Sequence, residues 1–224
     1  MSRHLDRQID RLKNMILSLS AVVEDSVCCA VKALVERDSA LATQVLNADA
    51  QVDEAEVEVE EEGLKILALY QPVAIDLRFI IAVLKINSDL ERVGDMAVNI
   101  AERAAFLAQQ EPPEMPIDFR EMAGKAQAML RQSLDALVNM DSALALQVCA
   151  QDDQVDEINR QMYLRIQDAI RAYPDRLEAL MHLLAVSRHL ERIADHATNI
   201  AEDVIYMVAG EIVRHRAADY QSQF

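Results

Sequence analysis

The chain has 224 residues and carries 38 Asp and Glu against 22 Lys and Arg, a formal charge of −16. Residues 1–110 and 111–224 hold equal numbers, 19 acids and 11 bases each, so the negative charge is uniform and we expect no nucleic-acid partner. A hydrophobic content of 52% excludes a disordered chain, and four Gly, five Pro and no Trp beside abundant Ala, Leu and Glu indicate an all-α protein.

The sequence favours a cytoplasmic protein. Apolar runs such as residues 79–84 are far too short to span a bilayer. The N-terminal stretch contains Asp6 and Asp10 and no Ala-x-Ala site, which argues against a signal peptide. The three cysteines are an odd number within helical patterns, and we expect them to be reduced and mostly buried.

The first half predicts three long helices. Apolar residues recur every three or four positions from Leu5 to Leu34, the pattern of one amphipathic helix. This helix ends near Asp38-Ser39, where an N-capping residue opens a second helix. The second helix continues to about Gln71, and a third extends from about Pro72 to Gln109.

The same order returns in the second half, with breaks at Asp141-Ser142 and Tyr173-Pro174. Three of the five prolines lie within residues 112–116, the one plausible linker between domains. We therefore predict six long helices in two tandem antiparallel three-helix bundles. The first bundle would span residues 1–109, the linker 110–117 and the second bundle 118–224.

The two halves are copies of one unit. Residues 33–54 match 136–157 at 15 of 22 positions, and residues 90–102 match 190–202 at 9 of 13. The offset falls from 103 to 100 between these blocks, so the length difference lies near the turn between the second and third helices.

Each half contains two pairs of acidic residues spaced i, i+4, which places both carboxylates of a pair on one helix face. Hairpins centred on residue 72 and on 173–174 would bring the two pairs of each half opposite one another. Four like charges so close need cations or protons. The residues are Asp49, Asp53, Glu91 and Asp95 in the first half, and Asp152, Asp156, Glu191 and Asp195 in the second.

These positions predict a metal cluster in each half. Oxygen ligands favour hard cations, so Mg²⁺, Mn²⁺, Ca²⁺ and iron are candidates, with zinc possible. The Glu-x-x-His pattern of di-iron bundles is missing. The alternative is a solvated acidic face, which the matching register in both halves makes less favoured. Asn99, Glu102, Asn199 and Glu202 share the same helix faces as weaker candidate ligands.

Two other features carry less weight. An acidic run, residues 54–62, is expected to be a solvated helix surface, because its counterpart in the second half is barely acidic. His189 and His196 flank the second carboxylate block, where the first block has Asp89 and Met96, and a ligand role for either histidine is the less favoured reading. We find no nucleophile–base motif or phosphate-binding Gly loop.

The doubled block Glu-Arg-x-x-Asp-x-Ala-x-Asn-Ile-Ala-Glu, at residues 91–102 and 191–202, resembles the signature of the PhoU family, accessory regulators of the bacterial phosphate-specific transport system. The turn Gln-Pro-Val-Ala-Ile-Asp-Leu-Arg at 71–78 resembles it too, and the likeness extends over essentially the whole chain. The second half departs from it with the shorter turn Tyr-Pro-Asp-Arg at 173–176.

The resemblance implies two three-helix bundles with multinuclear metal clusters on the eight carboxylates. It also implies a cytoplasmic, non-enzymatic, often dimeric adaptor that meets the membrane only through its partners. Those partners would be the ATPase subunit of the phosphate ABC transporter and a phosphate-sensing histidine kinase, with phosphate-starvation genes repressed when phosphate is ample. The runner-up function is a carboxylate-bridged metalloenzyme, and a third is a purely structural helical oligomer.

Overall fold

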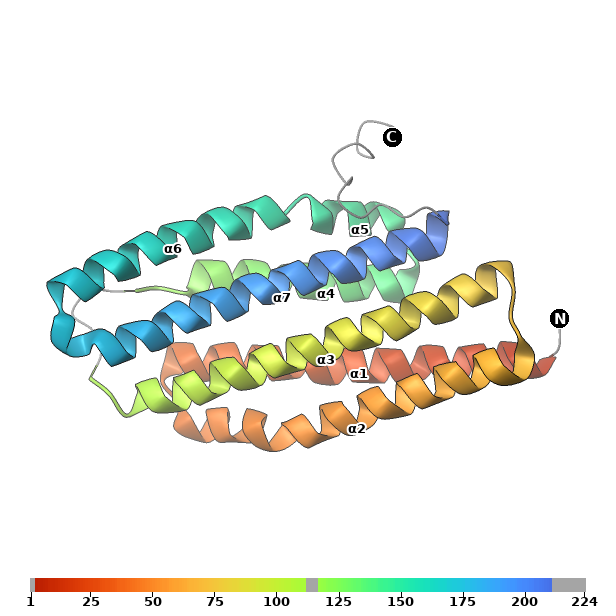
Figure 1. The fold of residues 1–224 in the computed structure, drawn as a ribbon, viewed down its shortest axis with the longest axis horizontal. Coiled ribbons are helices and arrows are strands. Elements are labelled where there is room, and N and C mark those ends of the chain that lie inside the picture. The colour runs from red at the N-terminus through yellow and green to blue at the C-terminus, as the bar shows by residue number, and fades with distance from the viewer. Residues whose placement is uncertain (1–2, 112–116, 211–224) are drawn as a thin grey trace.

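The computed structural model describes residues 3–111 and 117–210, and over these ranges the chain is almost entirely helical (Figure 1). The predicted linker 110–117 and the end of the second predicted unit therefore lie partly outside the described residues. The helices are α1 (Arg3–Glu36), α2 (Ser39–Tyr70), α3 (Ala74–Ala108), α4 (Arg120–Asn139), α5 (Ser142–Cys149), α6 (Asp152–Ala172), the short 3₁₀ helix η1 (Pro174–Arg176) and α7 (Leu177–Ala209).

The first bundle forms because α1 presents one apolar stripe to its neighbours. Leu12, Ile16 and Val23 are fully buried at the helical spacing that the sequence predicts. The predicted break at Asp38 is confirmed, since its side chain accepts hydrogen bonds from the backbone N–H groups of Ala40 and Leu41 and caps α2.

The second bundle repeats this plan with one interruption. Asp141 caps α5 as Asp38 caps α2, through the N–H groups of Ala143 and Leu144. The long helix expected after this cap ends at Cys149 and begins again at Asp152, which gives α5 and α6. The predicted all-α fold with two three-helix bundles is confirmed, and the second half divides one predicted helix in two.

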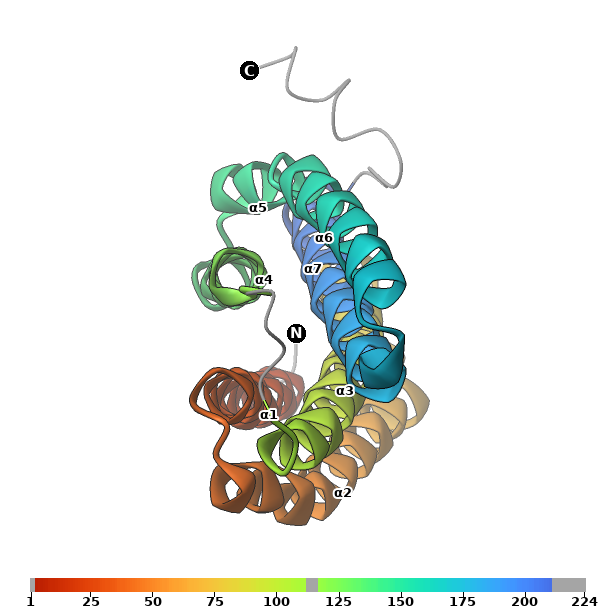
Figure 2. The ribbon, with the colours of Figure 1, turned by 90° about the vertical axis from the view of Figure 1, so that its left-hand side faces the viewer.

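The bundles lie side by side along α3 and α7, which are antiparallel and occupy the middle of the molecule (Figure 2). Buried residues of both halves form one continuous hydrophobic core. Lys85 on α3 donates to Asp203 on α7 at 3.0 Å, and Asp203 is 2% exposed. The division at residues 109 and 118 therefore stays a prediction, because the two units share a core.

Among the described residues, α1 from His4 to Glu36 is long and apolar enough to cross a membrane, although 44% of its most apolar stretch is buried and a buried core helix passes the same test.

Cys28 is exposed rather than buried, because it lies off the apolar stripe of α1, while Cys29 and Cys149 are half-buried. All three thiols are unbridged, as expected.

Candidate metal centres

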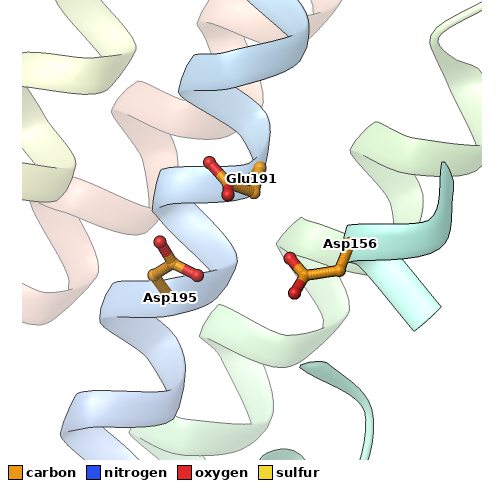
Figure 3. Close-up of side chains that lie close together, drawn as sticks. All are labelled: Asp156, Glu191 and Asp195. Carbon is orange, nitrogen blue, oxygen red and sulfur yellow. The ribbon is translucent and has the colours of Figure 1, made fainter. Parts of the chain in front are cut away.

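Three carboxylates of the second half converge across the α6–α7 hairpin. Asp156 on α6 points toward Glu191 and Asp195, which lie one turn apart on α7 (Figure 3). Each offers an oxygen, and these oxygens all lie within 4.8 Å of one another. In the described part of the chain this is the one such trio drawn from His, Cys, Asp and Glu. Its members are three of the four residues that the sequence predicts for this half.

Asp152, the fourth predicted member, is the first residue of α6. Its carboxylate accepts a hydrogen bond of 3.1 Å from the hydroxyl of Thr198 on α7, which orients it across the hairpin. It lies close enough to Asp195 to raise the pKa of that side chain. The structure therefore brings all four predicted carboxylates of this half to one place.

The second cluster is electrostatically strained without cations. Burial raises the pKa of Glu191, and Asp195 and Asp156 raise it further. Burial also raises the pKa of Asp195, with added repulsion from Asp152 and Asp156. For Asp152, burial raises the pKa although the Thr198 hydroxyl works in the opposite direction. Each shift disfavours the charged carboxylate, so the site favours either protons or a bound cation.

The first cluster assembles across the α2–α3 hairpin in the same way. Burial raises the pKa of Asp49, and its next two causes are Asp53 and Asp95. Burial and then Asp95 raise the pKa of Glu91, with a smaller contribution from Asp53. Asp53 is exposed, whereas Asp49, Glu91 and Asp95 are half-buried. The predicted register thus brings the four carboxylates within electrostatic range, without the tight trio of the second half.

Glu56 is a fifth acidic residue near the first cluster that the sequence reading missed. It is half-buried and accepts a hydrogen bond of 3.2 Å from the Asn87 amide. Burial raises its pKa, followed by repulsion from Glu60 and Asp53. The expectation of a wholly solvated acidic run is also wrong at Glu62, which is 6% exposed and bonds Lys65. Glu56 follows the buried Val52 by four residues and Glu62 follows the buried Val59 by three, so both lie near the buried face of α2. This spacing could have identified them from the sequence.

The four weaker candidates are engaged in other contacts. Asn99 donates to the backbone carbonyl of Asp95 at 2.7 Å, and its own side-chain oxygen accepts from Arg103. Asn199 donates to Asp89 at 3.4 Å. Glu102 is exposed beside Arg103, and Glu202 is half-buried close to the Cys149 thiol, whose pKa is raised to about 12 chiefly by burial. Their role as ligands stays a prediction.

The two histidines join α7 to α3. His196 Nδ1 lies 2.8 Å from a carboxylate oxygen of Asp89, and His189 Nδ1 lies 3.2 Å from the sulfur of Met96. Positions 89 and 96 are the counterparts of 189 and 196 in the duplication, so the two contacts are related by the internal symmetry of the molecule. Both histidines therefore lie at the interface between the two bundles.

The donor chemistry fits hard cations. Carboxylate oxygens gathered from two helices provide the ligands that Mg²⁺, Mn²⁺, Ca²⁺ or iron take, and a bound cation would relieve the repulsion that raises the pKa values. Asp156, Glu191 and Asp195 are the residues best placed to share one ion.

Comparison with known proteins agrees with the architecture. The family model described as the PhoU domain matches the chain twice, over residues 16–104 and 119–204. The chain belongs to the PhoU family. The two matched segments correspond to the two halves of the duplication, and the resemblance inferred from the doubled acidic block is confirmed.

Named relatives cover nearly the whole chain. The phosphate-specific transport system accessory protein PhoU homolog of Aquifex aeolicus is 38% identical, covering 95% of this chain and 96% of that protein. The homolog of Pseudomonas aeruginosa is 37% identical, covering 96% and 89%.

The fold also matches solved structures. The crystal structure of PhoU from Pseudomonas aeruginosa gives a TM-score of 0.90 at 36% identity, covering 92% of this chain and 99% of that one. The crystal structure of the phosphate transport system regulatory protein PhoU from Streptococcus pneumoniae gives 0.84 at 27%, covering 93% and 99%.

Proposed function

We propose that this protein is a metal-binding cytoplasmic regulator of phosphate uptake and a negative regulator of the phosphate-starvation (Pho) regulon. Membership of the PhoU family, whose relatives are named accessory proteins of the phosphate-specific transport system, supports the regulatory role. The convergence of Asp156, Glu191 and Asp195 within 4.8 Å supports the metal and is the observation that carries this part of the proposal.

The metal would act by holding helices together. Each cluster draws its carboxylates from both helices of one hairpin, so a bound ion crosslinks α2 to α3 or α6 to α7. An ion that binds only the assembled cluster stabilises the folded state by mass action. We infer that the ions fix the shape of the helical surface that partners recognise, and that the protein catalyses no reaction of its own.

The partners would be the ATPase subunit of the phosphate ABC transporter and a phosphate-sensing histidine kinase, with the protein acting as an adaptor between them. We further propose that it works as a homodimer and reaches the membrane only through these partners. The uniform negative charge supports protein partners over nucleic acid.

Co-purification tests the adaptor role. The tagged protein, expressed from its own locus in phosphate-rich medium, should retain the transporter ATPase and the kinase, and deletion of its gene should raise expression of phosphate-starvation genes. Recovery of neither partner, with unchanged gene expression, would contradict the adaptor proposal while leaving metal binding intact. The molar mass from light scattering tests the homodimer in the same preparation.

A metalloenzyme is the alternative, and one observation favours it. A groove of about 550 Å³ opens beside Asp156 and Glu191, as a substrate site next to a metal would. Metal-dependent turnover of a phosphate ester, lost in the Glu191→Gln variant, would support the enzyme over the adaptor.

A further inference from the structure

The groove beside the second cluster has an unusual lining. Besides Asp156, Glu191 and the apolar Leu164 and Leu184, it is lined by side chains that donate hydrogen bonds, from both α6 and α7. These are Asn159, Arg160, Tyr163 and Arg188. Two guanidinium groups and a phenol thus share one concave surface with two candidate metal ligands.

The duplication allows a residue-by-residue comparison with the first half. On α6, Val155 and Met162 are buried at the positions where α2 buries Val52 and Val59, an offset of 103. A hydrogen bond between the paired helices recurs at equivalent positions as well. Asn87 donates to Glu56 in the first half, and Ser187 donates to Asn159 at 2.6 Å in the second.

In this register the residues that line the groove differ in charge from their counterparts in the first half. Arg160 stands where the first half has Val57, and Tyr163 stands where it has the exposed Glu60. On α7, Arg188 replaces Ser88. The position of Asn159 is taken by Glu56. The equivalent surfaces are therefore acidic beside the first cluster and carry two arginines beside the second.

We propose that the groove on the α6–α7 hairpin binds a phosphate-class oxyanion between Arg160, Arg188 and the metal-loaded carboxylate cluster. Planar guanidinium groups match the oxygens of a phosphate, and the Tyr163 hydroxyl and Asn159 amide add donors of the kind that fix its orientation. Arg160 is held by Glu157 through Nε and Nη2, at 2.8 and 2.7 Å, which leaves Nη1 for a ligand.

The charges explain why only the second half would bind the anion. Cations bound to the cluster offset Asp156 and Glu191, and Glu157 offsets Arg160, so that Arg188 leaves the groove with a net positive charge. Cations in the first cluster would still leave Glu56 and Glu60 facing the equivalent surface. The inference therefore rests on the metal binding proposed above, and its test must report metal content separately.

Titration calorimetry of the purified full-length protein, metal-loaded or treated with a chelator, provides the test. Inorganic phosphate and glycerol 3-phosphate are titrated in parallel, because the groove is large enough for either ligand. Arg188→Ser and Arg160→Val install the first half's own residues, and Arg131→Ser, at an exposed arginine on α4, is the control for loss of one positive charge. Metal content is measured on every sample.

The metal-loaded wild type and the Arg131→Ser control should bind with equal affinity, and each groove variant should bind about tenfold or more weakly. Tighter binding of one ligand identifies whether the anion is free phosphate or a phosphate ester. The inference is overturned if metal-loaded protein shows no saturable binding, or if the groove variants bind as tightly as the control. Protein that retains no metal would instead contradict the proposed metal binding.

Discussion

Glu191 and Asp195 show at the residue scale why the clusters favour protons or a bound cation. They lie one turn apart on α7, face Asp156, and have pKa values raised first by burial and then by their neighbours. On an isolated helix such side chains could face solvent and stay charged. Here the α6–α7 hairpin holds them next to one another, so the repulsion between their charges is present whenever the chain is folded.

The raised pKa values predict how the stability of the metal-free protein depends on pH. A group whose pKa is higher in the folded chain than in the unfolded chain stabilises the fold below its ordinary value, 3.8 for Asp and 4.5 for Glu. This contribution is lost as pH rises through the higher folded-state pKa. The free energy of unfolding of the metal-free protein should therefore increase as pH falls from neutral toward these ordinary values, measured by urea denaturation.

A double variant isolates this effect from the general relief of negative charge at low pH. Glu191→Gln with Asp195→Asn removes two of the shifted groups and should flatten the pH dependence. An unchanged slope would contradict the assignment. In the metal-loaded wild type the trend should reverse, since protons compete with the metal for the same oxygens.

The grouping of the eight carboxylates across the hairpins was predictable because their spacing and the hairpin centre are both readable in the sequence. An i, i+4 pair specifies one helix face, and Pro72 and Pro174 mark the turns that set which pairs face each other. Glu56 was not singled out, because it lies in an acidic run whose other members, such as Glu54 and Glu58, are exposed. Helical phase sets Glu56 and Glu62 near the buried Val52 and Val59, and their contacts with Asn87 on α3 and Arg11 on α1 appear only in the folded structure.

At the scale of elements, Gly94 lets α3 approach α2 at the first cluster. It lies next to Asp95, and a Cβ at this position would lie 3.1 Å from Cγ1 of the buried Val52, one residue before Asp53. The second half has Ala194 in its place, so α6 and α7 accommodate the methyl group. The two hairpins therefore differ by one methyl group at this duplicated position.

Two glycine-to-alanine variants test this contact. Gly124→Ala on α4, where a Cβ meets nothing within 4 Å, should raise the free energy of unfolding by about 0.5–1 kcal/mol through helix propensity. Gly94→Ala has the same propensity gain but crowds Val52, and should lower the free energy of unfolding by about 1 kcal/mol. Equal stabilisation by both substitutions in denaturant unfolding would show that α2 and α3 are not in close contact here.

The break between α5 and α6 could not be predicted. Ala150 and Gln151 include neither Gly nor Pro, and the surrounding sequence closely matches the part of the first half that forms the uninterrupted α2. The structure ties Gln151 to Gln132 on α4 by a hydrogen bond of 2.8 Å, a tertiary contact that helical periodicity does not report. The break makes Asp152 the first residue of α6.

At the scale of the whole molecule, α3 and α7 join the duplicated halves through one core. Because these helices lie against each other along their length, the halves should unfold together rather than as separate domains. Circular dichroism and calorimetry of the metal-free protein should give one coincident thermal transition. Two resolved transitions would instead support the domain division at residues 109 and 118.

The Lys85–Asp203 pair tests the same interface by mutation. Lys85→Met removes the ammonium group that bonds the carboxylate of Asp203, which is 2% exposed. This should lower the free energy of unfolding by about 1–2 kcal/mol, since the lysine itself is 38% exposed. Lys65→Met, at a half-exposed lysine that bonds Glu62 within the first bundle, provides a matched comparison. The Lys85 variant should also broaden the single transition, whereas the Lys65 variant should leave it sharp.

Metal content per half tests the central claim most directly. Elemental analysis of extensively dialysed protein is compared among the wild type, a first-half variant and a second-half variant, each with its four cluster carboxylates changed to Asn or Gln. We predict bound metal in the wild type, loss of the first half's share in one variant and of the second half's share in the other, with helical circular dichroism retained. Wild-type protein without bound metal, or equal metal in all three proteins, would contradict the account.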